Sequence, residues 1–345
     1  MNSPPTKPVS AIAGIGSFSK INKTSRCHLM KNYKQKCKII SAFMTVFLCL
    51  PFSANAQNFS FSVDTHVGLM FGHTHEYVYR GDRQISRLEW DENAVPFANA
   101  ALIFRFRNVF LNGTIRAAIP VTSGKMRNFD YLLPNSDALT HFSQHNAFLD
   151  RHNNFNVSVG YNHDIKNFSL SPSLGFVFSN RKWTASDGFL QYALSGTALQ
   201  GNEPIRTVTG PVVIYELTKM YFSASLAFSY SFLDRFRISL NFQAFPYIWA
   251  HALDHHILRA TEFFDHMPGG RGGSLGLTFI YHLTPSLDLV GGVVYEHFFK
   301  QKGNTGQRLI GIGRPRNFIR SPEHSGAYSS RLWSVFLGTK LRTIF

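Results

Sequence analysis

Cysteine is scarce in this 345-residue chain. The three that occur, Cys27, Cys37 and Cys49, all lie within the first 56 residues. Residues 57–345 therefore contain no thiol. A disulfide framework, a cysteine metal site and a cysteine nucleophile are excluded for that part of the chain.

Acidic side chains are also missing from the first 56 residues, which carry eight Lys or Arg and no Asp or Glu. Without them the formal net charge falls from +15 to +7 (15 − 8). This modest excess favours a basic surface that meets phosphate-bearing lipid. Nucleic acid is not expected as a partner, because its binding needs a basic patch on a recognisable module.

A long apolar helix is absent as well, since the apolar run Ile39–Leu50 is too short to cross a bilayer. Four lysines precede this run within residues 30–38, and the small residues Ala54 and Ala56 follow it. This order is typical of a secretory signal peptide with its cleavage site. We interpret residues 30–56 as the signal peptide, 1–29 as a tail or an incorrectly assigned start ahead of Met30, and 57–345 as the mature domain.

The mature part is rich in strict period-two alternation, which indicates strands. In residues 222–232 the even positions are Phe, Ala, Leu, Phe, Tyr and Phe, and the odd positions are Ser, Ser, Ala, Ser and Ser. Residues 155–161 and 236–244 repeat the pattern, with Arg237 and Gln243 facing away from phenylalanines. In lipid, only a closed barrel pairs every strand backbone group, with apolar side chains outside and polar ones inside. We therefore predict an all-β fold, a ten-stranded antiparallel transmembrane β-barrel of the bacterial outer membrane.

The connections between the predicted strands alternate between short and long. Short turns of such barrels face the periplasm and long loops face outward. The long connections are expected at 124–147, 186–208, 253–270 and 301–326. The predicted strands are 57–79, 84–106, 108–123, 148–165, 168–185, 209–232, 235–252, 271–284, 287–300 and 327–345.

Acidic residues and histidines are concentrated in or beside the outward connections, so distant segments would converge on one rim. Most of them are individually explained as solvated loop surface. Asp254, His255 and His256 stand out, because an imidazole beside a carboxylate keeps a defined tautomer and a raised basicity. The full set is His73, His75, Glu76, Asp82, Asp130, His141, His145, Asp254, His255, His256, Asp265 and His266.

Five stretches, in order along nearly all of 57–345, resemble the omptins, ten-stranded outer-membrane proteases of Gram-negative bacteria. Gly72–Tyr79 with Gln84–Trp90 is similar to the family's first hairpin, and the last strand closes on a terminal aromatic, Phe345. Three more stretches resemble the loop with the family's Asp-x-Asp pair, the segment with its Asp-x-His and its Lys-Gly-Asn-Thr loop. They are Ser123–Tyr131, Trp249–His256, and Tyr295 with Lys302–Thr305.

The resemblance implies an aspartic-type endopeptidase that cleaves peptides next to basic residues without a covalent intermediate. In the family an Asp–His pair activates water, and an Asp pair across the cleft positions it and stabilises the tetrahedral intermediate. His256 would be the general base and Asp254 its orienting partner. His255 is an alternative base, because this loop is shorter than the family's. Asp130 would be the acid across the cleft.

One departure concerns Asn128, which stands where the family has the first Asp of its acid pair. Asn can hydrogen-bond the water but cannot share a proton with Asp130, unless Asp137 contributes instead. An alternative function is therefore an inactive barrel of the same fold that serves as an adhesin or surface-binding protein. A lipid A deacylase or phospholipase ranks last, because no Ser–His spacing singles itself out.

Substrate and lipid binding are also implied by the resemblance. Glu76 matches an acid that grips a basic side chain. Its counterpart near Ala252 and Leu253 is missing, which predicts a weaker preference for Arg or Lys. Lipopolysaccharide is expected as a requirement for activity, and no metal or other cofactor is expected. The other expected partners are surface peptides or proteins and the barrel assembly machinery. Basic candidates for the lipid are Arg151, Arg181, Lys182 and Lys219.

Overall fold

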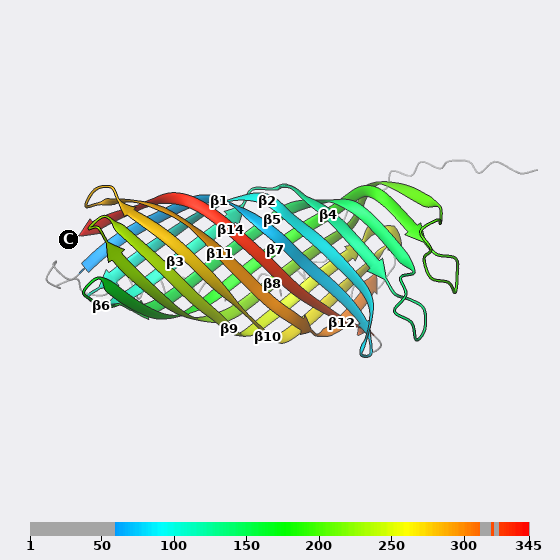
Figure 1. The fold of residues 1–345 in the computed structure, drawn as a ribbon. Helices are drawn as coiled ribbons and strands as arrows, with labels where there is room; N and C mark the ends of the chain where they lie inside the picture. The colour runs from blue at the N-terminus through cyan, green and yellow to red at the C-terminus, as the bar shows by residue number, and fades with distance from the viewer. Residues whose placement is uncertain (1–58, 311–318, 321–323, 345) are drawn as a thin grey trace, which may run out of the picture. The chain divides into compact units, whose positions relative to one another are not determined.

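A computed structural model describes residues 59–310, 319–320 and 324–344 (Figure 1). The predictions for residues 1–29, for the signal peptide 30–56 and for Phe345 lie outside the described residues. None of the described residues forms a helix long and apolar enough to cross a membrane.

The described residues form one antiparallel sheet whose ends meet, so that the sheet closes into a barrel (Figure 1). A 3₁₀ turn at Ile257–Arg259 joins two of the strands. The strands are β1 (Phe59–Arg80), β2 (Arg83–Phe106), β3 (Val109–Ala118), β4 (Val121–Asp130), β5 (His141–Tyr161), β6 (His163–Ile165), β7 (Phe168–Tyr192), β8 (Ile205–Phe232), β9 (Phe236–His256), β10 (Thr261–His282), β11 (Leu287–Lys302), β12 (Asn304–Leu309), β13 (Ile319–Arg320) and β14 (His324–Ile344).

Ten strands make up the ring, because several labels are parts of one barrel strand. β3 and β4 follow each other between β2 and β5, β6 continues β5 beside β7, and β12 continues β11 beside β10. The short β13 pairs with β12. The ring closes where the last strand, β14, pairs with both β1 and β11. The predicted ten-stranded antiparallel barrel is confirmed.

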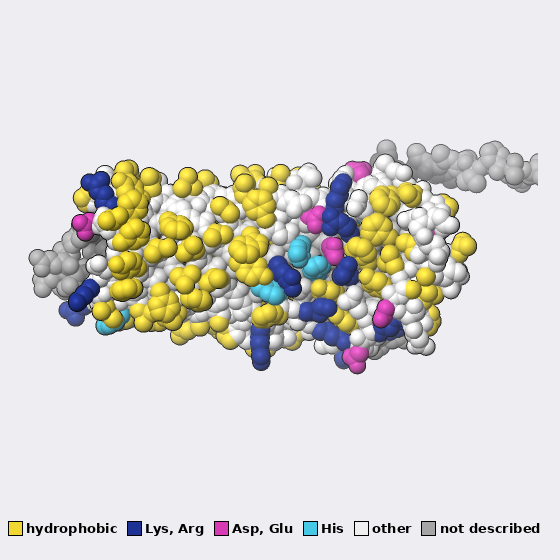
Figure 2. All heavy atoms as spheres, in the orientation of Figure 1, with side chains coloured by type: hydrophobic (Ala, Val, Ile, Leu, Met, Phe, Trp, Pro, Cys, Tyr) yellow, Lys and Arg dark blue, Asp and Glu magenta, His cyan; other side chains and the backbone are white. Residues whose placement is uncertain are grey.

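The alternation of the sequence divides the two faces of the wall. On β8, Phe222 is 51% exposed, while its neighbour Ser223 is 3% exposed. Polar side chains on the inner face hydrogen-bond across strands, as Gln243 does to Ser225 at 3.1 Å. The outer face carries an apolar belt, which on β1 ends at Phe71. Figure 2 shows hydrophobic side chains over one part of the barrel and charged and histidine side chains gathered toward one end.

Strands on one side of the apolar belt extend well beyond the predicted ends. β9 continues to His256 and β10 begins at Thr261, so the predicted connection 253–270 shrinks to residues 257–260. Outside the belt the outer face no longer needs apolar residues, as His251 and His255 illustrate, so the apolar alternation stops before the strands do. We call this end the loop end, and the opposite end, with connections such as 107–108 and 166–167, the turn end.

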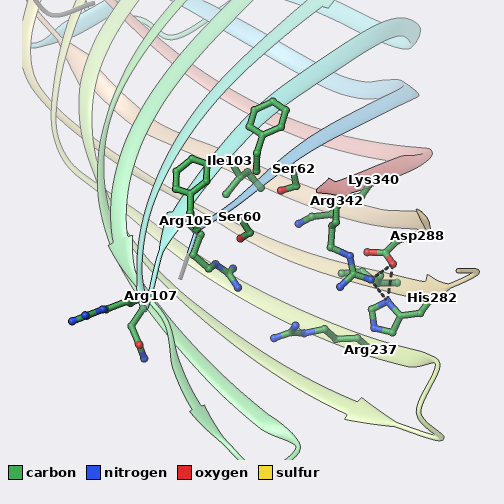
Figure 3. A pocket seen from close by; sticks show the side chains of 14 residues that line it. Ser60, Ser62, Ile103, Arg105, Arg107, Arg237, His282, Asp288, Lys340 and Arg342 are labelled. Carbon is green, nitrogen blue, oxygen red and sulfur yellow. Dashed lines mark hydrogen bonds and ion pairs between the residues drawn. The ribbon is translucent and has the colours of Figure 1, made fainter. Parts of the chain in front are cut away.

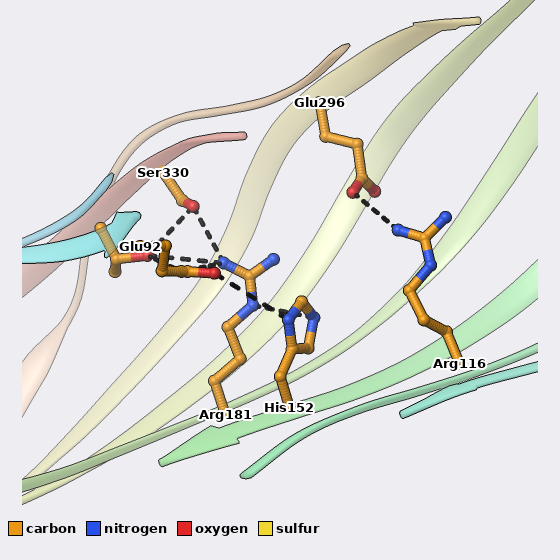
Figure 4. Close-up of polar contacts among 7 residues, drawn as sticks. Glu92, Arg116, His152, Arg181, Glu296 and Ser330 are labelled. Atoms are coloured by element: carbon orange, nitrogen blue, oxygen red, sulfur yellow. Dashed lines mark hydrogen bonds and ion pairs between the residues drawn. The ribbon is translucent and has the colours of Figure 1, made fainter. Parts of the chain in front are cut away.

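Buried ion pairs fill the lumen between the two ends (Figure 4). Arg181 of β7 lies 3.2 Å from a carboxylate oxygen of Glu92 and donates to His152 at 3.1 Å and to Ser330 at 3.1 Å. All four residues are buried. We call them the lumen plug.

The lumen plug corrects one prediction. Arg181 and Lys219 were candidates for binding lipopolysaccharide on the barrel exterior, but both side chains are buried inside, and the Lys219 ammonium lies 3.3 Å from the centroid of the Phe298 ring. A charge on the inner parity of a strand belongs to the lumen, and sequence alone did not fix that parity for these two residues.

Candidate active site

The pair Asp254 and His256 lies on the inner face of β9 at the loop end. The two residues are separated by one position, so a strand directs both side chains to the same face. His256 Nε2 lies 2.5 Å from Asp254 Oδ2. The adjacent His255 points to the other face, where its Nδ1 is 3.8 Å from Glu262. The structure thus brings His256, and not His255, to Asp254.

Glu76 joins Asp254 from β1, past the end of the apolar belt. Both carboxyl groups are 2% exposed. Burial, the charges of Asp254 and Asp265 and a hydrogen bond with Asp254 raise the pKa of Glu76 well above its usual value. A buried cluster of three acids cannot hold three negative charges, so protons are shared within it.

Asp265 is the third acid, and the sequence gave no specific role to it. It lies on β10 directly across from Ala252 of β9, the position near which the family's second substrate-binding acid is missing. Thr305 donates to its carboxylate at 2.5 Å. Burial raises the pKa of Asp265 to about 7, against the hydrogen bond from Thr305 and with the help of the charge of Asp254. Cross-strand register is the signal that would have identified this residue.

Aromatic side chains lie against the three acids. Tyr215 of β8 stacks on Trp90 of β2 with ring centroids 5.8 Å apart, and on Trp183 of β7 at 5.9 Å. All three rings are fully buried. They exclude water around the carboxyl groups, which is the physical reason why their protons are held so tightly. We call Glu76, Asp254 and Asp265 with these rings the acidic pocket.

Asp130 and Asn128 lie on the inner face of β4, on another wall of the ring. Asn128 donates to Asp130 across 3.4 Å and accepts from Ser86 at 3.0 Å. The backbone carbonyl of Asp130 accepts from the Thr140 hydroxyl at 2.9 Å, which fixes the end of the strand. Asp137, which was considered as a substitute acid, is 96% exposed in the connection that follows β4.

The two walls are not joined in the structure. β4 pairs with β2 and β5, whereas β9 pairs with β8 and β10, so the acid and the Asp–His pair belong to separate parts of the ring. No hydrogen bond between described residues connects Asp130 or Asn128 to Asp254 or His256. Among the described residues no group of three His, Cys, Asp or Glu side chains could hold a metal ion.

Fold and site together define a bacterial outer-membrane barrel that carries an Asp–His pair and an acidic pocket at one end of its lumen. A model of the omptin family matches residues 57–318. The chain therefore belongs to the omptin family, which confirms the resemblance seen in its sequence. Family and barrel together point to the outer membrane.

Comparison with solved structures supports the fold. The outer membrane protease OmpT from Escherichia coli is 17% identical, with a TM-score of 0.74 over 82% of this chain and 97% of that chain. Two matches have TM-scores too low to support any argument. They are the translocator domain of the autotransporter NalP from Neisseria meningitidis (8% identity, 90% and 97% covered, 0.33) and Neisserial surface protein A, NspA (10%, 83% and 97%, 0.25). No curated protein matches the chain in sequence.

Proposed function

We propose that this protein is an outer-membrane endopeptidase that cleaves peptides next to basic residues at the loop end of its barrel. The observation that carries the proposal is the 2.5 Å contact between His256 and Asp254 on the inner face of β9, at the positions that match the family's Asp-x-His. An imidazole held by a buried carboxylate has a fixed orientation and can accept a proton from water.

In this mechanism His256 Nε2 stays hydrogen-bonded to Asp254, which leaves Nδ1 to take a proton from the attacking water. The water adds to the peptide carbonyl, and the resulting oxyanion needs a donor or a positive potential. Asp130 supplies the acid on the other wall, and Asn128 orients it through its amide. Because Asn128 has no proton to share, the reaction depends on Asp130 alone rather than on a coupled pair.

The acidic pocket is the proposed binding site for the basic side chain of the substrate. A guanidinium or ammonium group that enters between Glu76 and Asp265 releases their protons and forms charge-assisted hydrogen bonds. The sequence predicted a weak preference for Arg or Lys because an acid was missing near Ala252. Asp265, directly across from Ala252, supplies a carboxylate from the neighbouring strand. We therefore propose a clear preference for basic residues.

The loop end is proposed to face the outside of the cell, where peptide and protein substrates would be encountered. Lipopolysaccharide is proposed to be required for activity. The test of this requirement is the rate of cleavage by lipid-free protein before and after addition of purified lipopolysaccharide, with phosphatidylglycerol as the control lipid. Equal activation by both lipids would contradict a specific requirement.

The deciding experiment is cleavage of a quenched fluorescent peptide that contains Arg-Arg or Arg-Lys by purified protein with lipopolysaccharide. The matched variants are His256→Ala and Asn128→Asp. We expect activity in the wild type, loss in His256→Ala and a gain in Asn128→Asp, because a second carboxylate restores proton sharing with Asp130. Cleavage by Asn128→Asp alone would indicate a decayed protease. Silence in all three proteins would contradict the proposal and favour a surface-binding role.

A further inference from the structure

The turn end of the lumen holds a cavity of about 580 Å³ that none of the reactions above uses. Its walls come from both ends of the mature chain and from strands between them. Figure 3 shows Arg105, Arg237 and Arg342 directed toward the same space, whereas Arg107 points away from it. Lys340 completes the cationic lining.

Positive charge exceeds negative charge in this cavity. Against its cations stands one lining carboxylate, Asp288. The nearest further acids have other partners: Asp64 lies 2.5 Å from His66, and Asp164 accepts from Asn162 at 2.7 Å. Cations gathered in a confined lumen repel one another unless counter-charge enters.

Two of the cations lack a protein partner. Among the described residues no hydrogen bond or ion pair engages the side chain of Arg105 or of Lys340. Arg342 is partly engaged: one nitrogen lies 2.5 Å from Asp288 and 3.0 Å from His282, while its buried Nε has no partner. Arg237 donates to the Ser169 hydroxyl. The lining therefore keeps donors available around one space.

We propose that this cavity binds a small, multiply charged oxyanion of the phosphate class, which enters from the turn end. Guanidinium groups present paired N–H donors that match phosphate oxygens, and an ammonium group adds a point charge. The strands enclose the space laterally, which excludes a lipid headgroup. Access is from the exposed turn at Arg107 and Asn108, since the lumen plug lies on the other side. The cavity volume suits an anion of the size of pyrophosphate.

The test is isothermal titration of the purified full chain with pyrophosphate, at constant ionic strength in a detergent without phosphate groups. Arg105→Gln on β2 and Lys340→Gln on β14 are each expected to weaken binding at least about tenfold, because each removes a charged donor. Two variants on different strands are used so that a folding defect in one does not decide the result. Arg235→Gln, in an exposed turn outside the cavity, is the matched control and should change binding less than about twofold.

Three results would overturn the proposal: no binding to the wild type, equal weakening by Arg235→Gln, or no weakening by either cavity variant. A parallel titration with citrate defines the ligand class. Binding of both anions supports an oxyanion site, and binding of pyrophosphate alone narrows it to phosphate. Peptide cleavage is not part of this readout, so its result is independent of the protease proposal.

Discussion

The two ends of the lumen each contain a histidine beside a buried aspartate, yet their surroundings are opposite. At the loop end His256 lies 2.5 Å from Asp254, with the acids Glu76 and Asp265 close by. At the turn end His282 lies 2.7 Å from Asp288, and Arg342 takes the same oxygen at 2.5 Å. A His–Asp pair is thus no catalytic site by itself. The charges around the pair decide whether the carboxylate is available to orient the imidazole.

The lumen plug separates these two environments. Glu92 and Arg181 neutralise each other in the region between them, and they are held by His152 and Ser330. A continuous water path would let counter-ions from either end screen the charges of the other. The plug therefore keeps an acidic end suited to basic peptides apart from a basic end suited to anions.

The largest expected effect breaks the loop end alone. His256→Gln removes the proposed base and should lower kcat/KM for an Arg-Lys peptide by about 10²–10⁴-fold. His255→Gln, one residue away on the outer face, is the control and should stay within about twofold. Steady-state kinetics on both variants measure the difference. Equal loss in the two variants would mean that this strand end matters for structure and not for chemistry.

The next effect removes the separator. Arg181→Met leaves Glu92 buried without its cation, which should lower the free energy of unfolding by about 3–5 kcal/mol. The double variant Arg181→Met/Glu92→Leu should recover most of this loss, because no isolated charge remains. Urea unfolding of the barrel in detergent measures both. A single variant as stable as the wild type would show that water already reaches the plug.

The pH dependence of stability sharpens the contrast between the ends. The folded pKa of Asp265, about 7, lies above its ordinary value of 3.8, so the folded protein binds this proton more tightly than the unfolded chain. This stabilising contribution is complete below about pH 4 and is lost as pH rises through 7. Asp265→Asn should therefore raise unfolding stability at pH 8 by about 2–4 kcal/mol and leave it unchanged at pH 4. Unfolding curves at both values test this, and an effect that is equal at both would contradict it.

The smallest expected effect concerns substrate affinity. Because the acidic pocket must ionise to hold a cation, KM for an Arg-containing peptide should fall between pH 6 and pH 8 in the wild type. Asp265→Asn should raise KM at pH 8 by about tenfold and flatten this dependence, since a charge-assisted hydrogen bond is lost. An unchanged pH profile of KM in the variant would place the basic side chain elsewhere.

Most of the fold was predictable from the chain. Alternation in residues 222–232 and 236–244 fixed which face meets lipid, because a strand inverts its side chains at every residue. The strand ends beyond the apolar belt were not predictable in this way. There, both faces of the wall carry polar residues, as His255 and Asp254 illustrate, so hydropathy loses its period.

The site was predictable in part. Asp254, His256, Asp130, Asn128 and Glu76 were named from the family resemblance, and their positions on inner faces agree with a shared rim. Sequence left His255 and His256 as alternative partners of Asp254, whereas the parity of β9 places His256 beside it. Asp265 received no role, because its place across from Ala252 depends on the register between two strands.

The sequence by itself determined a cysteine-free, alternating chain that can satisfy its backbone in lipid only as a closed barrel, since local periodicity dictates which side chains are apolar. The tertiary structure decided what the lumen contains. It collected the acids of β1, β9 and β10 at one end and the unpaired cations of β2 and β14 at the other. Closure brings residues from both ends of the chain within a few ångströms, and that proximity is written in no local stretch of sequence.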